Sequence, residues 1–394
     1  MKIKKFIGKL HLWLGLISGL IVFIVSITGC IYVFQEDIKD TMYPGRTVEI
    51  IGDKTVSVEK MIANAEQAID NKHKANFIVR YTSLDRASMV QIYKFKPLEE
   101  TGLFTWYGET MDYFYRIYVD PYSGKVLEVE NTKWEFFNLV EFTHTSLLLG
   151  PIGNRIIALS VLFFLILVVT GIILWWPKNK KAFKMNTWFR WKPTTKWKRK
   201  NYDLHNILGF YASLVLLVSI ITGLSWSYEW FKNGVHWFAN MGYKKTQVTN
   251  QMSNTNLNSV QIEDPIEFVD KTIQQKYPNS IRYWLTPSTT KISPINIYID
   301  NGHITEAIIE TYDSQNGKLI QKKTMHDFDN GGKIDWMNYD IHTGSILGFP
   351  GKLLAFFASL ISASLPITGF LIWYNRKFKK RRKASKPSKL KVTT

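Results

Sequence analysis

The sequence predicts an α-helical membrane protein: a four-transmembrane-helix bundle with internal two-fold duplication, plus two extracytoplasmic α+β modules. Three observations support this fold class. They are four long apolar segments, basic residues gathered beside those segments, and a set of motifs that occurs twice at the same spacing. The mean hydropathy of −0.10 averages over very different segments, so the segments themselves decide the fold class.

Each of the four apolar segments carries about 20 or more mostly apolar residues, enough to cross a hydrocarbon core of about 30 Å. They lie at about residues 6–34, 152–176, 204–231 and 349–374. Lys2, Lys4 and Lys5 precede the first segment as in a signal peptide. That segment is too long for a signal peptide and lacks a small-x-small cleavage site, so we expect it to remain as a helix.

The expected organisation places two modules between the helices. In chain order it is transmembrane helix 1 (1–34), module 1 (35–143), a histidine segment with helix 2 (144–176), a basic loop (177–201), helix 3 (202–231), module 2 (232–341), a histidine segment with helix 4 (342–374) and a basic tail (375–394).

Basic residues predict the orientation of this bundle. Residues 177–201 and 375–394 each hold ten Lys or Arg and no acid, and the first nine residues hold four Lys. The positive-inside rule assigns these regions to the cytoplasm, so both termini are expected inside and both modules outside. The other 26 of the 50 basic residues face 32 acidic ones, so the net charge of +18 reports topology. We therefore expect membrane lipids as partners and no nucleic acid.

Each module has the pattern of a small α+β fold. A helical stretch, at 57–70 or 265–276, is followed by alternating strands and by a turn that begins Asp120 or Asp313 and contains Gly124 or Gly317. Asp and Gly suit a tight hairpin turn. The single cysteine, Cys30, falls in the first helix, so no disulfide staples either module and each must fold on its own core or on the membrane domain.

Four of the eight histidines belong to the duplicated pattern. His11 and His205 are each followed by Gly after four residues (Gly15, Gly209) and by Thr-Gly after seventeen. The second pair, His144 and His342, repeats as well, with Gly six residues on and Thr-Gly twenty-six residues on. The remaining histidines have no counterpart in the opposite half. The duplication therefore selects four imidazoles as site candidates.

Several of these segments resemble a known family. The stretch from Asp120 to Leu127 and its second copy look like the end of PepSY domains. The His144 to Pro151 segment, the Thr-Gly pairs and the Trp175-Trp176-Pro177 helix end are similar to the PepSY-associated transmembrane family. That family includes iron-regulated inner-membrane proteins and haem-containing ferric-siderophore reductases. The resemblance covers nearly the whole chain and implies a haem-binding four-helix unit with two PepSY-like modules facing the periplasm.

The positions of the histidines agree with haem. Helices one and three run in the same direction, so His11 and His205 share one depth near the cytoplasmic face, and diagonal helices stand about 11–14 Å apart. This is the room that a porphyrin needs with one imidazole on each side. Gly15 and Gly209 lie on the histidine face, where they leave space for a flat ring. The alternative for this pair is interfacial histidines that snorkel.

His144 and His342 are expected together near the outer face, on short segments that bend at the following Gly-Pro breaks. Their alternatives are a loosely held metal ion or a cap on the membrane boundary; a structural zinc site would need more ligands close by. The Thr-Gly pairs are expected to open gaps for the cofactor, with ordinary small-residue packing as the alternative. Arg155 and Lys352 outside, and Lys9 and Arg199 inside, are candidates for haem propionates or for lipid headgroups.

Two haem b groups, each held by two histidines (His11 with His205, His144 with His342), have no open iron position, so electron transfer is the expected chemistry. The resemblance implies a ferric(-siderophore) reductase in a bacterial inner membrane, with a ferric siderophore or ferric chelate as acceptor. No glycine-rich nucleotide fingerprint occurs, so the electron donor is expected to be external, a quinol or a partner reductase. The alternative is a non-redox membrane regulator or anchor for a peptidase or envelope partner.

Overall fold

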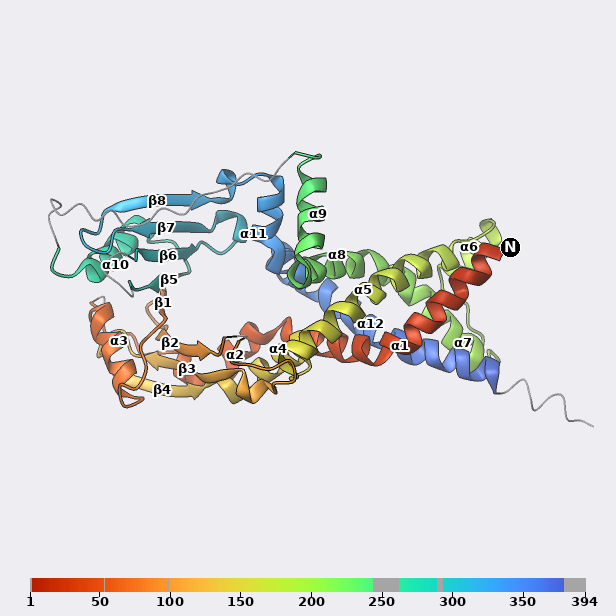
Figure 1. Ribbon diagram of the computed structural model, residues 1–394, viewed down its shortest axis with the longest axis horizontal. Helices are drawn as coiled ribbons and strands as arrows, with labels where there is room; N and C mark the ends of the chain where they lie inside the picture. Colours follow the sequence, from red (N-terminus) through yellow and green to blue (C-terminus); the bar gives the residue numbers. More distant parts are fainter. Residues whose placement is uncertain (1, 53, 98, 244–261, 289–292, 379–394) are drawn as a thin grey trace, which may run out of the picture.

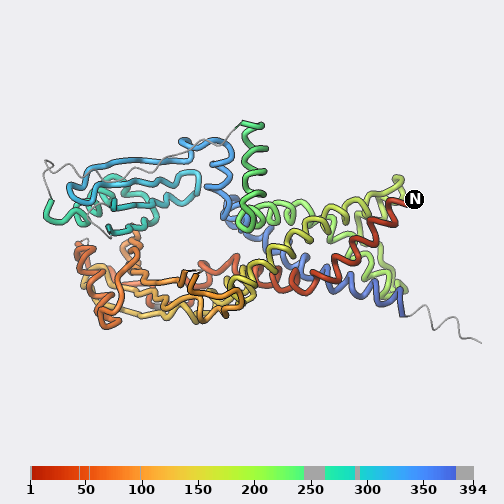
Figure 2. The backbone as a smooth tube through the Cα atoms, viewed as in Figure 1, coloured from red at the N-terminus to blue at the C-terminus, as the bar shows by residue number. Residues whose placement is uncertain are grey.

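The computed structural model describes residues 2–378, apart from positions 53, 98, 244–261 and 289–292. A helical bundle occupies one end of the elongated molecule and a β-sheet the other (Figures 1 and 2). Most of the expected basic tail, 379–394, lies outside the described residues.

Four helical spans in the described part of the chain are long and apolar enough to cross a membrane. They are α1 (Lys2–Tyr32), α5 (Gly150–Trp175), α7 (Trp197–Asp203) continued by α8 (Gly209–Ser227), and α12 (Gly348–Lys377). Helices α1 and α8 each pack against both α5 and α12, so α1 and α8 are diagonal partners, as the sequence predicts. Between α7 and α8 the chain makes a π-helical turn at Leu204–Leu208, which carries His205.

Helix boundaries differ from the expected ones at several places. The third span begins at Trp197 rather than 202, and it ends at Ser227 because Tyr228 adopts an extended conformation. The module boundaries expected at 143 and 341 fall inside helices α4 (Phe136–Ser146) and α11 (Asn330–Thr343), which carry His144 and His342. Apolar residues run on past these points, so hydropathy alone does not mark the bends.

The two modules form one eight-stranded antiparallel sheet, in the order β4-β3-β2-β1-β5-β6-β7-β8. The strands are β1 (Phe77–Tyr81), β2 (Ser88–Phe95), β3 (Met111–Val119), β4 (Val126–Asn131), β5 (Arg282–Thr286), β6 (Ile295–Asp300), β7 (Ile308–Tyr312) and β8 (Leu319–Thr324). Pairing of β1 with β5 joins the halves. Helices α3 (Val58–Gln67) and α10 (Pro265–Lys276) add to a shared core that includes Val58, Ile78, Val269 and Leu285. The two halves thus share one core, whereas each module was expected to fold on its own core or on the membrane domain.

The hairpin turns form as predicted. The Asp120 carboxylate accepts a hydrogen bond from the Tyr122 amide at 2.8 Å, and Gly124 has a φ of +76°. In the second half Asp313 accepts from the Gln315 amide at 2.8 Å, and Gly317 has a φ of +63°. These backbone conformations favour glycine because a side chain would meet its own backbone.

One buried ion pair crosses the junction between the halves. Arg80 on β1 lies 3.3 Å from Asp270 on α10, and both side chains are at most 5% exposed. The hydroxyl of Tyr283 on β5 also hydrogen-bonds to Asp270 at 2.5 Å.

We expect Arg80→Met to destabilise the sheet by about 3–5 kcal/mol, because it leaves a buried carboxylate without its cation. The measurement is thermal unfolding of the detergent-solubilised protein, followed by circular dichroism in the β-sheet region. The double variant Arg80→Met/Asp270→Leu should recover most of the loss, since it removes both charges. Equal melting temperatures for wild type and Arg80→Met would contradict this assignment.

Candidate functional site

The four repeated histidines form two facing pairs. The distal pair, His11 on α1 and His205, lies toward the end of the bundle away from the sheet, with ring centres 6.3 Å apart and planes at 89°. The proximal pair, His144 on α4 and His342 on α11, lies next to the sheet, with ring centres 6.2 Å apart and planes at 76°. Each half of the chain gives one histidine to each pair.

Left-handed turns bring the proximal histidines back over the bundle. After α4, Leu147 and Leu148 take positive φ values, and Gly150, the first residue of α5, has a φ of +55°. After α11, Gly344 has a φ of +78°, and Gly348, the first residue of α12, has a φ of +63°. These turns change the direction of the chain between α4 and α5 and between α11 and α12.

Each histidine is held through Nδ1 by one of the four repeated threonines. The Nδ1–Oγ1 distances are 2.9 Å for His11–Thr170, 2.9 Å for His205–Thr368, 3.1 Å for His144–Thr28 and 2.8 Å for His342–Thr222. Every one of these threonine hydroxyls also donates to the carbonyl four residues earlier in its own helix.

This network fixes the tautomer of the four rings. A threonine hydroxyl has one proton, which it donates in the hydrogen bond to the helix carbonyl. The hydroxyl oxygen can therefore only accept a hydrogen bond from the Nδ1–H of the histidine. His144 Nδ1 additionally lies 2.9 Å from the carbonyl of Val25, which can only accept. None of the hydrogen bonds among the described residues uses Nε2 of these four rings. Each Nε2 is therefore left with a lone pair, the state in which imidazole binds a metal.

The repeated glycines lie against the same rings. A Cβ added at Gly171, Gly369, Gly29 or Gly223 would stand 3.5, 3.2, 3.3 or 3.6 Å from Cε1 of His11, His205, His144 or His342. At Gly369 and Gly29 an added Cβ would push against the imidazole, and at Gly171 and Gly223 it would be in van der Waals contact with it. The Thr-Gly pairs were expected to make room for the cofactor, and Gly171 and Gly369 do line the distal cavity described below. In addition, the threonine orients the histidine and the glycine leaves space for its ring.

A cavity of about 550 Å³ surrounds the distal pair. His11, His205, Gly15 and Gly209 line it, as does Arg376 near the end of α12. The volume falls within the range of cofactor sites, about 300–1,000 Å³. Arg376 was not predicted as a site residue, because in the sequence it is one of ten basic residues in the tail 375–394. A guanidinium at a cavity of this kind can pair with a carboxylate of a bound group.

Aromatic side chains also line this cavity, among them Trp175 and Trp373. The Trp175 ring stacks on Phe210 with centres 3.5 Å apart and is only 5% exposed. It is thus part of the cavity wall rather than a lipid-facing anchor.

Two of the four basic candidates for propionates form ion pairs with carboxylates. Lys352 pairs with Asp37 at 2.6 Å, and Arg199 pairs with Asp203 at 2.8 Å. Arg155 is exposed. Lys9 is also exposed, one residue before Leu10 on α1.

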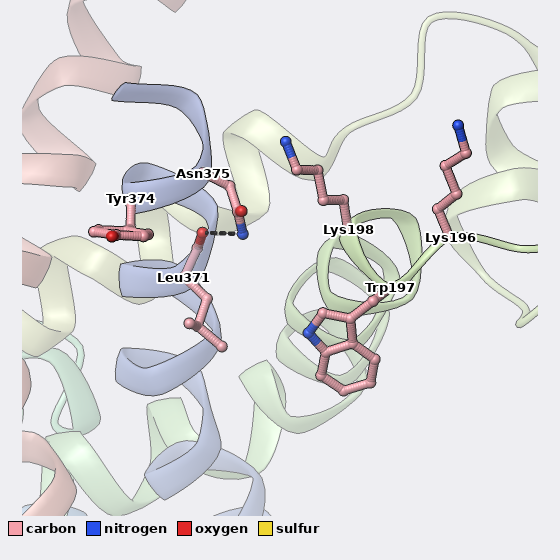
Figure 3. A pocket seen from close by; sticks show the side chains of 6 residues that line it. All are labelled: Lys196, Trp197, Lys198, Leu371, Tyr374 and Asn375. Carbon is pink, nitrogen blue, oxygen red and sulfur yellow. Dashed lines mark hydrogen bonds between the residues drawn. The ribbon is translucent and has the colours of Figure 1, made fainter. Parts of the chain in front are cut away.

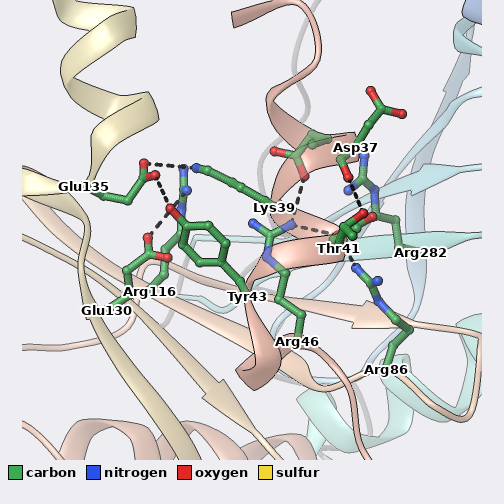
Figure 4. A network of polar contacts seen from close by, with 12 residues as sticks. Asp37, Lys39, Thr41, Tyr43, Arg46, Arg86, Arg116, Glu130, Glu135 and Arg282 are labelled. Atoms are coloured by element: carbon green, nitrogen blue, oxygen red, sulfur yellow. Dashed lines mark hydrogen bonds and ion pairs between the residues drawn. The ribbon is translucent and has the colours of Figure 1, made fainter. Parts of the chain in front are cut away.

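A polar network positions α4 and therefore His144 (Figure 4). The Glu135 carboxylate accepts the amides of Phe137 and Asn138 at the start of α4. Lys39 on α2 (Gln35–Met42) lies 3.1 Å from Glu135, and both side chains are almost completely buried. Burial lowers the pKa of Lys39. Burial alone would raise the pKa of Glu135, but the hydrogen bond from the Phe137 amide and the charge of Lys39 outweigh it, so the pKa of Glu135 is lowered. This cap ties the proximal pair to the sheet domain.

A shallow groove of about 390 Å³ lies beside the distal end of the bundle. Figure 3 shows Lys196, Trp197 and Lys198 on one side and Leu371, Tyr374 and Asn375 of α12 on the other. Basic and aromatic side chains beside a membrane span suit anionic lipid headgroups.

No group of three or more His, Cys, Asp or Glu that could hold a metal ion occurs among the residues with a described structure. A metal ion between either histidine pair would thus take two ligands from the protein and the others from a group bound with it.

Comparison with known proteins places the chain in a family. No curated protein matches it. The family model described as the PepSY-associated TM region matches residues 9–376, nearly the whole chain. Together with the four apolar spans, this match identifies a multi-pass membrane protein. The chain belongs to the PepSY-associated transmembrane family.

Proposed function

We propose that this protein transfers electrons across the membrane by means of two haem b groups, one held by His11 and His205 and the other by His144 and His342. The single observation that carries the proposal is the pairing of four imidazoles whose Nδ1 is committed to a threonine and whose Nε2 is left to bind. A merely structural histidine in an apolar bundle has no need of this arrangement.

The spacing of the rings fits a shared iron. Imidazole nitrogen binds a metal at about 2.0–2.1 Å and stands about 1.1 Å from its ring centre, so two imidazoles on opposite sides of one ion have ring centres about 6.3 Å apart. The observed distances of 6.3 and 6.2 Å agree. Two protein ligands suffice only when the bound group supplies the remaining donors, as a porphyrin does.

Haem with two imidazole ligands supplies reversible one-electron exchange without an open position for oxygen or substrate. The protein's own residues set the conditions for that exchange. The threonines hold each imidazole in one tautomer, the apolar bundle excludes water, and Arg376 offers positive charge to a carboxylate of the bound group. The two levels are about 26 Å apart, given 17 residues at about 1.5 Å each between His11 and Thr28 on α1.

We further propose that the end with the distal pair faces the cytoplasm, because the basic residues flank that end. The sheet then lies in the periplasm of a bacterial inner membrane, and a quinol or a partner reductase donates the electron. The proposed acceptor is a ferric siderophore or another ferric chelate, which holds iron less firmly once the metal is ferrous. The activity is thus that of a ferric(-siderophore) reductase.

The matched order of elements supports a duplicated origin for the sheet domain. Helix α3 with strands β1–β4 is followed in the second half by α10 with β5–β8. We infer that these are two PepSY-like modules.

The test is an absorption spectrum of the purified protein before and after dithionite, followed by addition of a panel of ferric chelates to the reduced protein. We expect sharp low-spin haem b bands, two haems per chain, and reoxidation by at least one chelate. Colourless, well-folded protein from haem-replete cells would overturn the proposal and favour a non-redox regulator or anchor. Coloured protein that no chelate reoxidises would retain the haem sites and reject the acceptor.

A further inference from the structure

Helix α9 (Glu229–Ala239) presents an apolar face that no described residue covers. Trp230, Trp237, Phe238 and Met241 are 62%, 63%, 81% and 86% exposed. Spacings of seven and eight residues from Trp230 place Trp237 and Phe238 on one side of the helix, with Gly234 among them, and Met241 follows just after the helix ends. Single exposed apolar residues are ordinary, but a stripe of large ones marks an interaction surface.

The opposite side of α9 is polar and faces the protein. His236 is buried, and its Nε2 lies 2.7 Å from the Asp335 carboxylate on α11, which Lys232 also approaches at 3.1 Å. The Asn240 side chain accepts the Gly331 amide at 2.9 Å. The helix is thus inverted relative to one that packs on a water-soluble domain: its polar side docks on α11 and its apolar side points out.

The place of α9 in the fold identifies what covers this face. It begins two residues after the end of the membrane span α8, and Figure 1 shows it running across the direction of the bundle. Helix α11 lies between α9 and the sheet, so the apolar face is turned to the side where the membrane-spanning helices lie. Trp226, near the end of α8, is also exposed.

We propose that α9 lies in the plane of the membrane interface next to the sheet domain, with Trp230, Trp237, Phe238 and Met241 inserted among the lipid headgroups and upper acyl chains. Tryptophan and phenylalanine on one face of a helix are the side chains that favour this region of a bilayer. Burial among lipids also removes an apolar stripe that would otherwise drive aggregation. This inference does not depend on haem.

The experiment uses the full chain in vesicles of phosphatidylcholine and phosphatidylglycerol. Cys30 is replaced by Ala, and single cysteines at Trp237 and Asn233 on α9 and at Met241 just after it carry a nitroxide spin label. Ile281→Cys, at an exposed site just before β5, is the matched control. Collision with oxygen, which concentrates in lipid, is compared with collision with a water-soluble nickel chelate.

We expect the labels at 237 and 241 to show an oxygen-to-nickel collision ratio several-fold above that at 281. The label at 233, on the flank of the helix, should give a ratio between the value at 281 and the values at 237 and 241. Two variants on the same face protect the result against one that fails to fold. Nickel accessibility at 237 and 241 equal to that at 281 would overturn the proposal. Protection from both reagents would also overturn it, since it would indicate a protein partner or a second copy on this face.

Discussion

We expect His205→Ala to halve the haem content of the purified protein and to leave the spectrum of the remaining haem low-spin. The reason is that His205 and His11 have ring centres 6.3 Å apart, while the second proposed site, formed by His144 and His342, lies about 26 Å away along the direction of α1. In the proposed distal site, this variant would remove an iron ligand that no neighbouring described side chain could replace. The haem-to-protein ratio, measured by the pyridine haemochrome method, checks this result.

The matched control for that variant is His326→Ala, since His326 is exposed and outside both pairs. It should retain the full haem content. His342→Ala should lose the other half, and the double variant His205→Ala/His342→Ala should be colourless. Full haem content in folded His205→Ala protein would refute the assignment of the distal pair.

We expect Thr368→Val to weaken binding of the proposed distal haem by about 10–100-fold, the range seen when a partner of a metal-bound histidine is removed. The variant keeps the size of the side chain but removes the oxygen that accepts the His205 Nδ1–H at 2.9 Å. The ring then loses the contact that fixes its tautomer and its direction. Competition with apomyoglobin for haem measures the change, and redox titration should show a shifted midpoint potential for one haem of the two.

The conservative variant Thr368→Ser separates orientation from packing. It restores the hydroxyl and should bring affinity and potential close to those of the wild type. If Val and Ser behave alike, the hydroxyl has no role in orienting His205, and the tautomer argument fails for that position.

The sequence predicted the features that depend on local composition and on repetition. Apolar length marked the four spans, and identical offsets selected the four histidines that the structure brings together in two pairs. The same offsets selected the Thr-Gly pairs that contact these histidines. Spacing could not assign their role, because the contact between Thr170 and His11 joins residues 159 positions apart.

Features that depend on tertiary packing were missed. The junction of β1 with β5 could not be foreseen, since nothing in a strand's composition names its partner in a distant segment. Lys352 pairs with Asp37, a carboxylate that only folding brings near, whereas Arg199 and Asp203 lie four residues apart on one helix and pair locally. Arg376 looked like one of many basic residues after a span, and only the shape of the cavity distinguishes it.

The seam between β1 and β5 has a consequence for how the two halves stay in register. Each histidine pair has one member from each half of the chain. A movement of one half relative to the other would therefore separate the histidines of both pairs. The halves are fastened at both extremities of the molecule, by helix packing at one and by a ladder of backbone hydrogen bonds reinforced by Arg80 and Asp270 at the other. The two halves are therefore aligned by these contacts and not by the basic loop that links them in the chain. The backbone hydrogen bonds between β1 and β5 help to keep the two histidines of each pair opposite one another.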